Sequence, residues 1–174
     1  MSEISTSLSS DLGEKKKVIL RKLDGKIIKG YLEGIPDWVG AEFLKILSLS
    51  DEIILVKKSE IKALFFVRRF GGNKEHAEVR FFDTHPKIDG LWIRITFKDD
   101  EVLEGIVSNS FDFFVQDGFY IKPPDPNTNN RLVYILKSAL KDMTILGIQY
   151  SRKNLAEFYE DFQNSKTATA KTAS

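Results

Sequence analysis

The stretch that decides the fold is Lys17-Val18-Ile19-Leu20-Arg21-Lys22-Leu23-Asp24-Gly25-Lys26-Ile27-Ile28-Lys29-Gly30-Tyr31-Leu32. Its first part is apolar and β-branched, as strands are. Asp24-Gly25 then supplies the dipeptide that a tight hairpin turn prefers. The chain continues as a second strand around Gly30, and a glycine inside a strand indicates a bulge or sharp bend. The stretch therefore predicts the opening hairpin of a small, strongly bent β-barrel.

A second passage, residues 92–107, repeats this design of strand, acidic turn and strand with one inner glycine. Asp24 and Asp99 lie 75 positions apart, and so do Gly30 and Gly105. The Lys-Ser dipeptides at positions 58 and 137 are 79 apart, which places four extra residues in the middle loops of the second copy. Matched spacing of this kind predicts an internal duplication.

Five strands are predicted in each half, from alternating or continuous apolar runs bounded by turn residues. At the C-terminus, apolar residues at i, i+3, i+4 and i+7 predict an amphipathic helix that Ser151 caps. We therefore expect a mainly β protein of two tandem five-stranded barrels plus a C-terminal helix. The expected parts are a disordered tail over 1–16, a first barrel over 17–70, a linker over 71–90, a second barrel over 91–150, the helix over 151–164 and a disordered tail over 165–174.

Composition excludes several classes of function. The 174 residues carry 26 basic and 25 acidic side chains, so a net charge of +1 gives no general attraction to nucleic acid or anionic membrane. The chain has no cysteine, which excludes thiolate chemistry and fits a reducing compartment. No apolar run reaches the roughly 20 residues of a membrane span. We expect a cytoplasmic protein without a membrane partner.

The assembled motifs resemble a tandem Sm-like fold, an SH3-like small barrel. Residues 23–32 are similar to the first Sm motif, with its Asp-Gly, apolar pair and Gly-x-Leu. Residues 54–61 and 133–140 are similar to the second motif, and the latter resembles the Val-Tyr-Lys-His-Ala-Ile segment of the bacterial Sm-like RNA chaperone. The resemblance implies two barrels and an RNA-binding role, in which Lys137 matches the lysine of that segment. Sm-like barrels in tandem also suggest a homo-oligomeric ring.

Catalysis has few candidates in this sequence. His76 and His85 are the only imidazoles, and both fall in the expected linker. No glycine-rich phosphate loop follows a strand and opens a helix. We therefore expect a binding module that is not an enzyme and needs no cofactor or metal.

Binding residues are predicted around the last strand of the first half. Phenylalanines are interspersed among the lysines and arginines there, as phosphate contact and base stacking on single-stranded RNA require. The predicted nucleic-acid site consists of Lys57, Lys58, Arg68, Arg69, Phe66, Phe70 and Lys137. Alternating faces of a barrel strand give the same pattern without any ligand.

The alternative function is a protein-interaction or signalling adaptor. An exposed barrel edge would accept a peptide strand by β-addition, or a long loop at 123–130 would present amide groups to a protein partner. The partner-binding residues of that loop are Asp125, Asn127, Asn129 and Asn130. The same Asp and Asn side chains are also typical of an ordered turn that satisfies its own backbone.

Overall fold

The computed structural model describes residues 15–34, 36, 38–72, 81–83, 86, 88–125 and 127–150. The predicted C-terminal helix, the tail over 165–174 and nearly all of the tail over 1–16 lie outside these ranges, as does most of the expected linker. The described residues are mainly β, with one α-helix. No helix among them has the length and apolar character needed to cross a membrane.

Ten strands and two 3-10 turns follow one another in the described residues. The first half contains β1 (Lys15–Lys22), β2 (Ile27–Glu33), β3 (Phe43–Ser48), β4 (Ile53–Lys57), the 3-10 turn η1 (Lys58–Glu60) and β5 (Ile61–Val67). The second half contains β6 (Gly90–Phe97), β7 (Val102–Val107), α2 (Phe111–Val115), β8 (Gly118–Ile121), β9 (Asn130–Leu136), η2 (Lys137–Ala139) and β10 (Leu140–Gln149). The sequence therefore predicted the number and order of the strands, but not α2.

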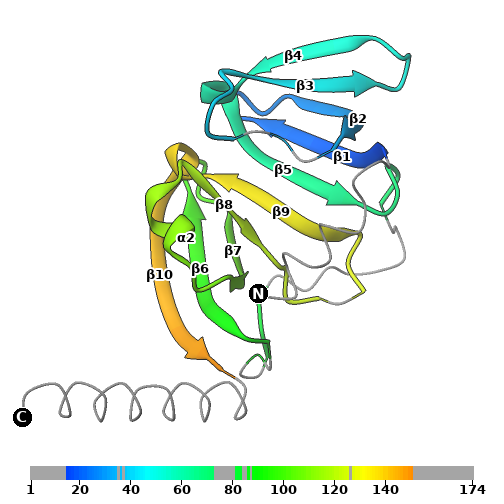
Figure 1. Cartoon of the computed structure of the whole chain (residues 1–174). Helices are drawn as coiled ribbons and strands as arrows, with labels where there is room; N and C mark the ends of the chain where they lie inside the picture. The colour runs from blue at the N-terminus through cyan, green and yellow to red at the C-terminus, as the bar shows by residue number, and fades with distance from the viewer. Residues whose placement is uncertain are drawn as a thin grey trace, which may run out of the picture.

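The strands form two antiparallel sheets (Figure 1). A seven-stranded sheet has the order β4-β3-β2-β1-β5-β9-β8, and a three-stranded sheet has the order β10-β6-β7. The sequence predicted two separate five-stranded barrels, and the observed strand pairing differs from that expectation. β9 pairs with β5, so β8 and β9 belong to the sheet of the first half. Neither sheet closes into a barrel within the described residues. An isolated bridge between Ile106 and Lys122 connects β7 to the start of the β8–β9 loop.

Both predicted hairpin turns form as their residues require. Gly25 has a φ of 84°, and Asp100 has a φ of 63° at the matching place 75 residues later. Asp24 accepts a hydrogen bond from the Lys26 amide through its side chain at 3.0 Å, an arrangement typical of aspartate at a turn.

Gly30 permits a close approach between β2 and β3. A Cβ at this position would lie 2.3 Å from the carbonyl oxygen of Leu47 and 2.6 Å from Cγ2 of Ile46. At Gly105 a Cβ would lie 2.3 Å from Ile121 and 2.7 Å from the carbonyl oxygen of Lys122. Each glycine therefore marks the place where the next strand crosses the hairpin closely, as its position inside a strand predicted.

Strand pairing follows the same register in both halves. The β1–β2 pairs recur in β6–β7 when 75 is added to each residue number. The β3–β4 pairs recur in β8–β9 when 75 is added on the first strand and 79 on the second. The β1–β5 register recurs in β6–β10, including the irregularity near the start of β5 and β10. The four additional residues of the second half therefore lie in the loop between β8 and β9.

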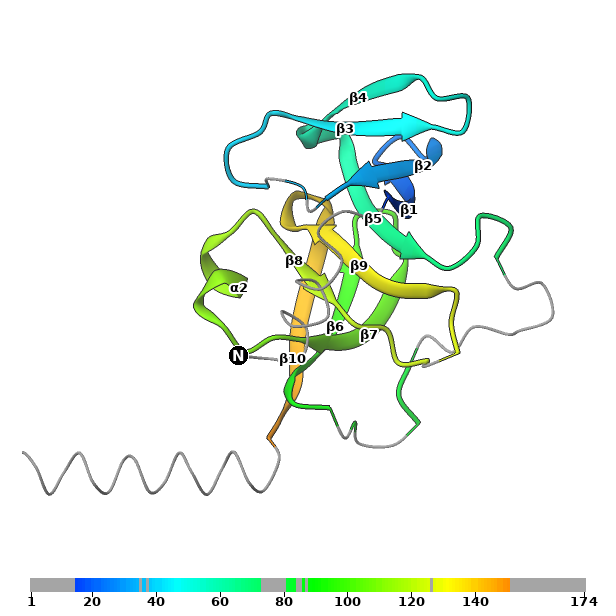
Figure 2. The same cartoon turned by 45° about the vertical axis from the view of Figure 1, so that its right-hand side comes forward.

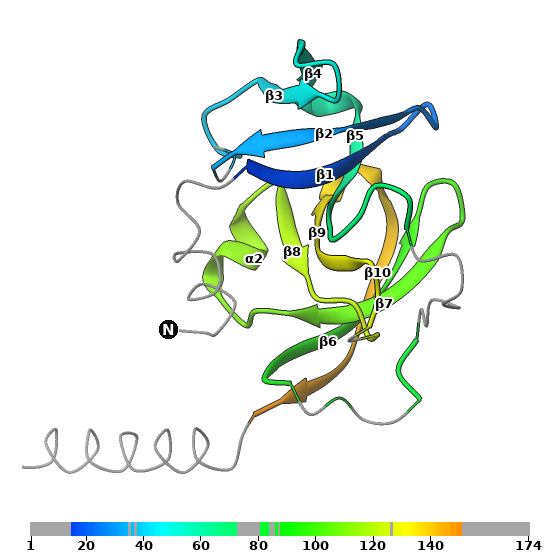
Figure 3. The same cartoon turned by 90° about the vertical axis from the view of Figure 1, so that its right-hand side faces the viewer.

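Two apolar cores share the β5–β9 pair. One core lies in the second half and contains alternate residues of β5, including Ala63 and Phe65. The other lies in the first half and contains the intervening β5 residues Leu64 and Phe66, together with Tyr134 of β9. All seven residues of β5 are buried. β5 and β9 run side by side in the middle of the molecule (Figures 2 and 3), and they join the halves into one body.

Candidate functional site

The predicted basic cluster is divided between the two ends of β5. Lys57 and Lys58 precede this strand, and Arg68 and Arg69 follow it. Seven extended residues separate the pairs by roughly 20 Å. The four cations that adjoin β5 in the sequence therefore do not form one surface cluster.

Lys58 is engaged inside the protein. Its Nζ donates to the Trp38 carbonyl and, at 3.0 Å, to Oδ2 of Asp117. Lys57 remains half-exposed beside Glu42, with 3.5 Å between Nζ and Oε1. Lys137 holds the position of Lys58 in the second half, and its Nζ donates to the Phe114 carbonyl at 3.0 Å. Lys58 therefore connects η1 to the β2–β3 connection, and Lys137 connects η2 to α2.

The predicted stacking residues differ in exposure. Phe66 is 8% exposed and belongs to the core of the first half, so its ring is not available to a base. Phe70 is partly buried, and its ring meets that of Tyr31 edge-on at 5.3 Å between centroids. Of the predicted aromatic residues, only Phe70 presents part of its ring beside the exposed Arg68 and Arg69.

The predicted partner-binding loop is tied to the segment that follows β5. Asn129 donates from Nδ2 to the Arg69 carbonyl and accepts from the Arg69 amide, both at 2.9 Å. Asp125 is 6% exposed and accepts from the Asn127 amide at 2.8 Å. The Asn130 amide donates to Thr128 Oγ1 at 3.1 Å. These side chains extend the β5–β9 pairing and satisfy backbone groups within the protein.

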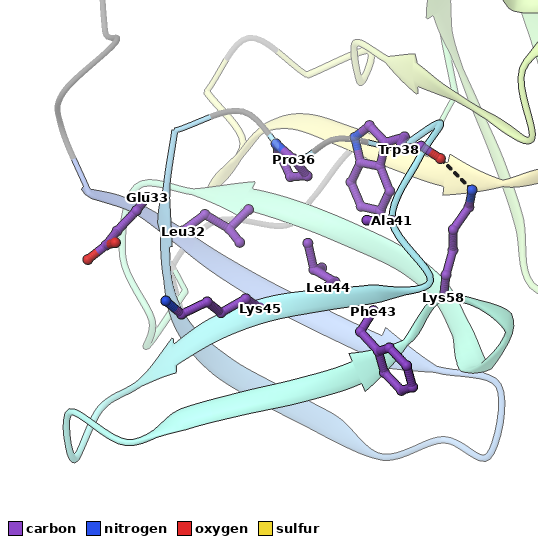
Figure 4. A pocket seen from close by; sticks show the side chains of 9 residues that line it. All are labelled: Leu32, Glu33, Pro36, Trp38, Ala41, Phe43, Leu44, Lys45 and Lys58. Atoms are coloured by element: carbon purple, nitrogen blue, oxygen red, sulfur yellow. Dashed lines mark hydrogen bonds between the residues drawn. The ribbon is translucent and has the colours of Figure 1, made fainter.

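A shallow depression of about 240 Å³ lies beside the β2–β3 connection (Figure 4). Trp38 forms part of its lining, together with Leu32, Pro36 and Leu44. The cation of Lys58 points to the Trp38 carbonyl at its edge. Six of the nine lining residues are apolar, and the other three are Glu33, Lys45 and Lys58, of which Lys58 is already paired. The depression therefore offers a ligand few polar groups that would orient it.

Trp38 crosses from the first half to the second. Its indole stacks on Tyr134 with centroids 3.8 Å apart and planes 7° apart, and its Nε1 donates to the Tyr120 hydroxyl at 3.0 Å. Burial raises the pKa of both tyrosines. The Tyr134 hydroxyl is buried without a hydrogen-bond partner among the described residues. This aromatic contact reinforces the β5–β9 pair and was missed from the sequence, because its residues are far apart along the chain.

A second connection between the halves is ionic. Lys62 of β5 is 7% exposed at its side chain, and its Nζ donates to Asp99 and, at 2.7 Å, to Glu101 in the β6–β7 turn. Arg21 of β1 reaches the same Glu101 carboxylate at 3.3 Å. The hydrogen bond from Lys62 lowers the pKa of Asp99. Lys62 is thus a structural cation that joins β5 to the β6–β7 turn.

Glu104 on β7 is a buried carboxylate that sequence reasoning also missed. It is 1% exposed and accepts from Arg94 at 2.6 and 2.9 Å, from Trp92 Nε1 at 3.1 Å and from the Phe82 amide at 3.1 Å. Four donors satisfy a carboxylate fully, so Glu104 holds together β6, β7 and the segment around Phe82 that precedes β6. Among the described residues, no group of three or more His, Asp or Glu side chains is arranged to hold a metal.

Among the residues that the structure describes, β4 and β10 each pair with one neighbouring strand only and leave their other edge open. β4 ends the seven-stranded sheet, and β10 ends the three-stranded sheet. Both strands carry large exposed apolar side chains: Ile53 and Leu55 on β4, and Met143, Ile145 and Ile148 on β10. Edge strands are usually protected by charge or proline, and an exposed apolar edge is a template for another strand.

These features define a mainly β protein built from two open antiparallel sheets that share the β5–β9 pair. The chain belongs to a family of unknown function, DUF6982, whose model matches residues 14–147. No curated protein and no solved structure matches the chain. The resemblance to Sm-like proteins therefore stays a prediction from the sequence motifs.

Proposed function

We propose that this protein is a non-catalytic binding module that takes an extended strand of a partner at an open sheet edge. The observation that carries the proposal is the apolar character of β4 and β10, which end the two sheets. An incoming strand would satisfy the backbone groups of the edge, and its alternate side chains would bury the exposed apolar residues. The partner is an extended segment with apolar residues at alternate positions.

The chain already uses this mode of recognition between its own halves. β9 adds to β5 as an antiparallel strand, with Leu64 opposite Tyr134 and Phe66 opposite Leu132. This contact combines a main-chain ladder with buried side-chain pairs, which together stabilise a sheet. The open edges of β4 and β10 carry apolar side chains as the β5–β9 pair does, so each suits an extended strand with apolar residues at alternate positions.

We further infer that the halves are copies of one Sm-like, five-stranded unit. The shared register of the strands and the matching close contacts of Gly30 and Gly105 support this duplication. The order β5-β1-β2-β3-β4 has its counterpart in β10-β6-β7 followed, across the Ile106–Lys122 bridge, by β8-β9.

Recognition of single-stranded RNA is the second candidate function. Its remaining support is the exposure of Arg68 and Arg69 beside the partly exposed Phe70. A filter-binding titration with a labelled single-stranded RNA at low salt tests it, because phosphate contacts strengthen as salt is removed. Binding that is saturable and weakened by Arg68→Ala with Arg69→Ala would support RNA recognition. No affinity at low salt would remove it.

A strand peptide tests the edge-binding proposal directly. The probe is a fluorescent peptide with the sequence of β9, Asn130–Leu136, which the protein itself places on β5. We expect saturable binding in fluorescence anisotropy and at least a tenfold loss of affinity in Ile145→Lys, because a lysine would replace an apolar contact on β10. Ile27→Lys is the matched control, since Ile27 is 57% exposed and lies on the interior strand β2. Absence of binding, or equal binding by Ile145→Lys, contradicts the proposal.

A further inference from the structure

β10 occupies the same place in the second half that β5 occupies in the first. Leu64 of β5 lies opposite Leu20 of β1, and Met143, 79 residues later, lies opposite Ile95 of β6. The next matched positions on the two strands are Phe66 and Ile145. The outward edge of β10 is therefore the counterpart of the edge of β5 that receives β9.

β4 is likewise the counterpart of β9. The β3–β4 and β8–β9 pairs share one register, so that Leu55 corresponds to Tyr134 and Ile53 corresponds to Leu132. In the β5–β9 pair, Tyr134 and Leu132 are the residues opposite Leu64 and Phe66. The chain thus has two edges of the β5 type, on β5 and β10, and two of the β9 type, on β9 and β4. The β5–β9 pair uses one edge of each type.

The unused edges differ from the used pair in exposure. Leu64 and Phe66, next to β9 in the sheet, are 0% and 8% exposed in the core of the first half. Their counterparts Met143 and Ile145 are 37% and 47% exposed. The corresponding residues of β4 are also exposed, Leu55 by 63% and Ile53 by 59%. The apolar positions that are buried in the used pair are therefore the ones left uncovered on β4 and β10.

We propose that a second copy of this chain covers these residues, with β4 of one copy adding antiparallel to β10 of the next. The register of the β5–β9 pair transfers directly and places Met143 opposite Leu55 and Ile145 opposite Ile53. This proposal rests on the strand-addition function proposed above and assigns its partner.

The placement of the two edges determines the form of the assembly. β4 lies at the top of the molecule in Figures 1, 2 and 3, whereas β10 runs through its lower part. One copy therefore offers different surfaces at two separate places, and the contact is head-to-tail. A head-to-tail contact repeats from copy to copy and produces a closed ring, or a filament if the rotation does not close.

Two single substitutions test this arrangement. Leu55→Lys disables β4 and leaves β10 intact, whereas Ile145→Lys disables β10 and leaves β4 intact. In sedimentation velocity across a range of concentrations, we expect the native chain to exceed its monomer mass of 19.9 kDa. Each variant alone should remain monomeric. A one-to-one mixture of the two variants should form a dimer of twice the monomer mass and nothing larger, because it contains one competent β4 and one competent β10.

Several results would overturn the proposal. A native chain that stays monomeric at every concentration, or a mixture that stays monomeric, excludes the β4–β10 contact. Assembly by Leu55→Lys alone would indicate a symmetric contact instead. Ile27→Lys, the control with an exposed apolar residue elsewhere, should assemble like the native chain. Far-UV circular dichroism shows whether each variant is folded. A monomer that still binds the β9 peptide would retain the proposed function and lose only the self-assembly.

Discussion

Tyr134 and Tyr120 are neighbouring residues whose hydroxyl groups have different surroundings. The Tyr120 hydroxyl accepts a hydrogen bond from Trp38 at 3.0 Å, whereas the Tyr134 hydroxyl is buried with no partner in the described part of the chain. A buried polar atom without a partner retains the full cost of leaving water. The ring of Tyr134 therefore stabilises the fold through stacking, while its oxygen destabilises it.

Phenylalanine at the two positions should have opposite effects. We expect Tyr134→Phe to leave the free energy of unfolding unchanged or to raise it by about 1 kcal/mol, because it removes the unpaired oxygen. Tyr120→Phe should lower it by about 1 kcal/mol, because the Trp38 indole then loses its acceptor. Urea denaturation at neutral pH measures both changes. A loss of stability in Tyr134→Phe as large as that in Tyr120→Phe would contradict this assignment.

Lys62 connects β5 with the β6–β7 turn, so its ion pair with Asp99 belongs to the scale of elements. The hydrogen bond from Lys62 lowers the pKa of Asp99 below its ordinary value of 3.8. A carboxyl whose pKa is lower in the folded state stabilises the protein above its unfolded pKa. That contribution is lost as the pH falls through the folded pKa.

Asp99→Asn should therefore cost stability at pH 7 and little at the lowest pH at which the protein still folds. We expect a cost of about 1 kcal/mol at pH 7, at the low end for a charged hydrogen bond because Asp99 is 58% exposed. The cost should shrink as the pH falls from about 5 toward 3 and below. Denaturant titrations at several pH values measure it, with Asp51→Asn at an exposed turn as the control. A cost that does not change with pH would argue against the ion pair.

Strands and turns were predictable because their causes are local. Gly25 adopts the positive φ expected of an Asp-Gly turn, and the glycine inside β2 allows the close approach expected of it. α2 was missed because five residues, Phe111–Val115, are too few to show a helical period. The stretch Ile61–Val67, apolar except for Lys62, contained a further signal: a strand without alternation is typically buried on both faces.

The candidate site was less predictable because it depends on contacts between distant residues. Lys58 follows Lys57 in the sequence, yet only the fold brings Asp117 and the Trp38 carbonyl to it. Phe66 lies two positions before Arg68 in the sequence, as a stacking residue could, but its side chain is buried in the core of the first half. The open edges depend on which strands pair across the halves, and no local pattern contains that information.

At the scale of the whole molecule, the shared β5–β9 pair makes the two cores interdependent. Trp38 belongs to the core of the first half, and Trp92 lies on β6 in the second. Because each core includes residues of both β5 and β9, loss of either core removes part of the other. The described residues should therefore unfold in one cooperative transition.

Variants with a single tryptophan report on each half. Trp38→Phe leaves only Trp92 as an indole fluorophore, and Trp92→Phe leaves only Trp38. In each variant, we expect the fluorescence midpoint in urea to coincide with the midpoint from far-UV circular dichroism. A fluorescence midpoint well below the circular-dichroism midpoint in either variant would show that one half unfolds before the other.

The complete burial of β5 has a consequence for the way this chain can change over evolutionary time. All seven residues from Ile61 to Val67 are buried: six belong to one core or the other, and Lys62 is held by two carboxylates. A mutation there alters the packing of both halves at once, so this strand has no position that can vary freely. Sequence drift in the family should accordingly concentrate in loops and tails, and residues 61–67 should tolerate the fewest replacements in a library of random variants.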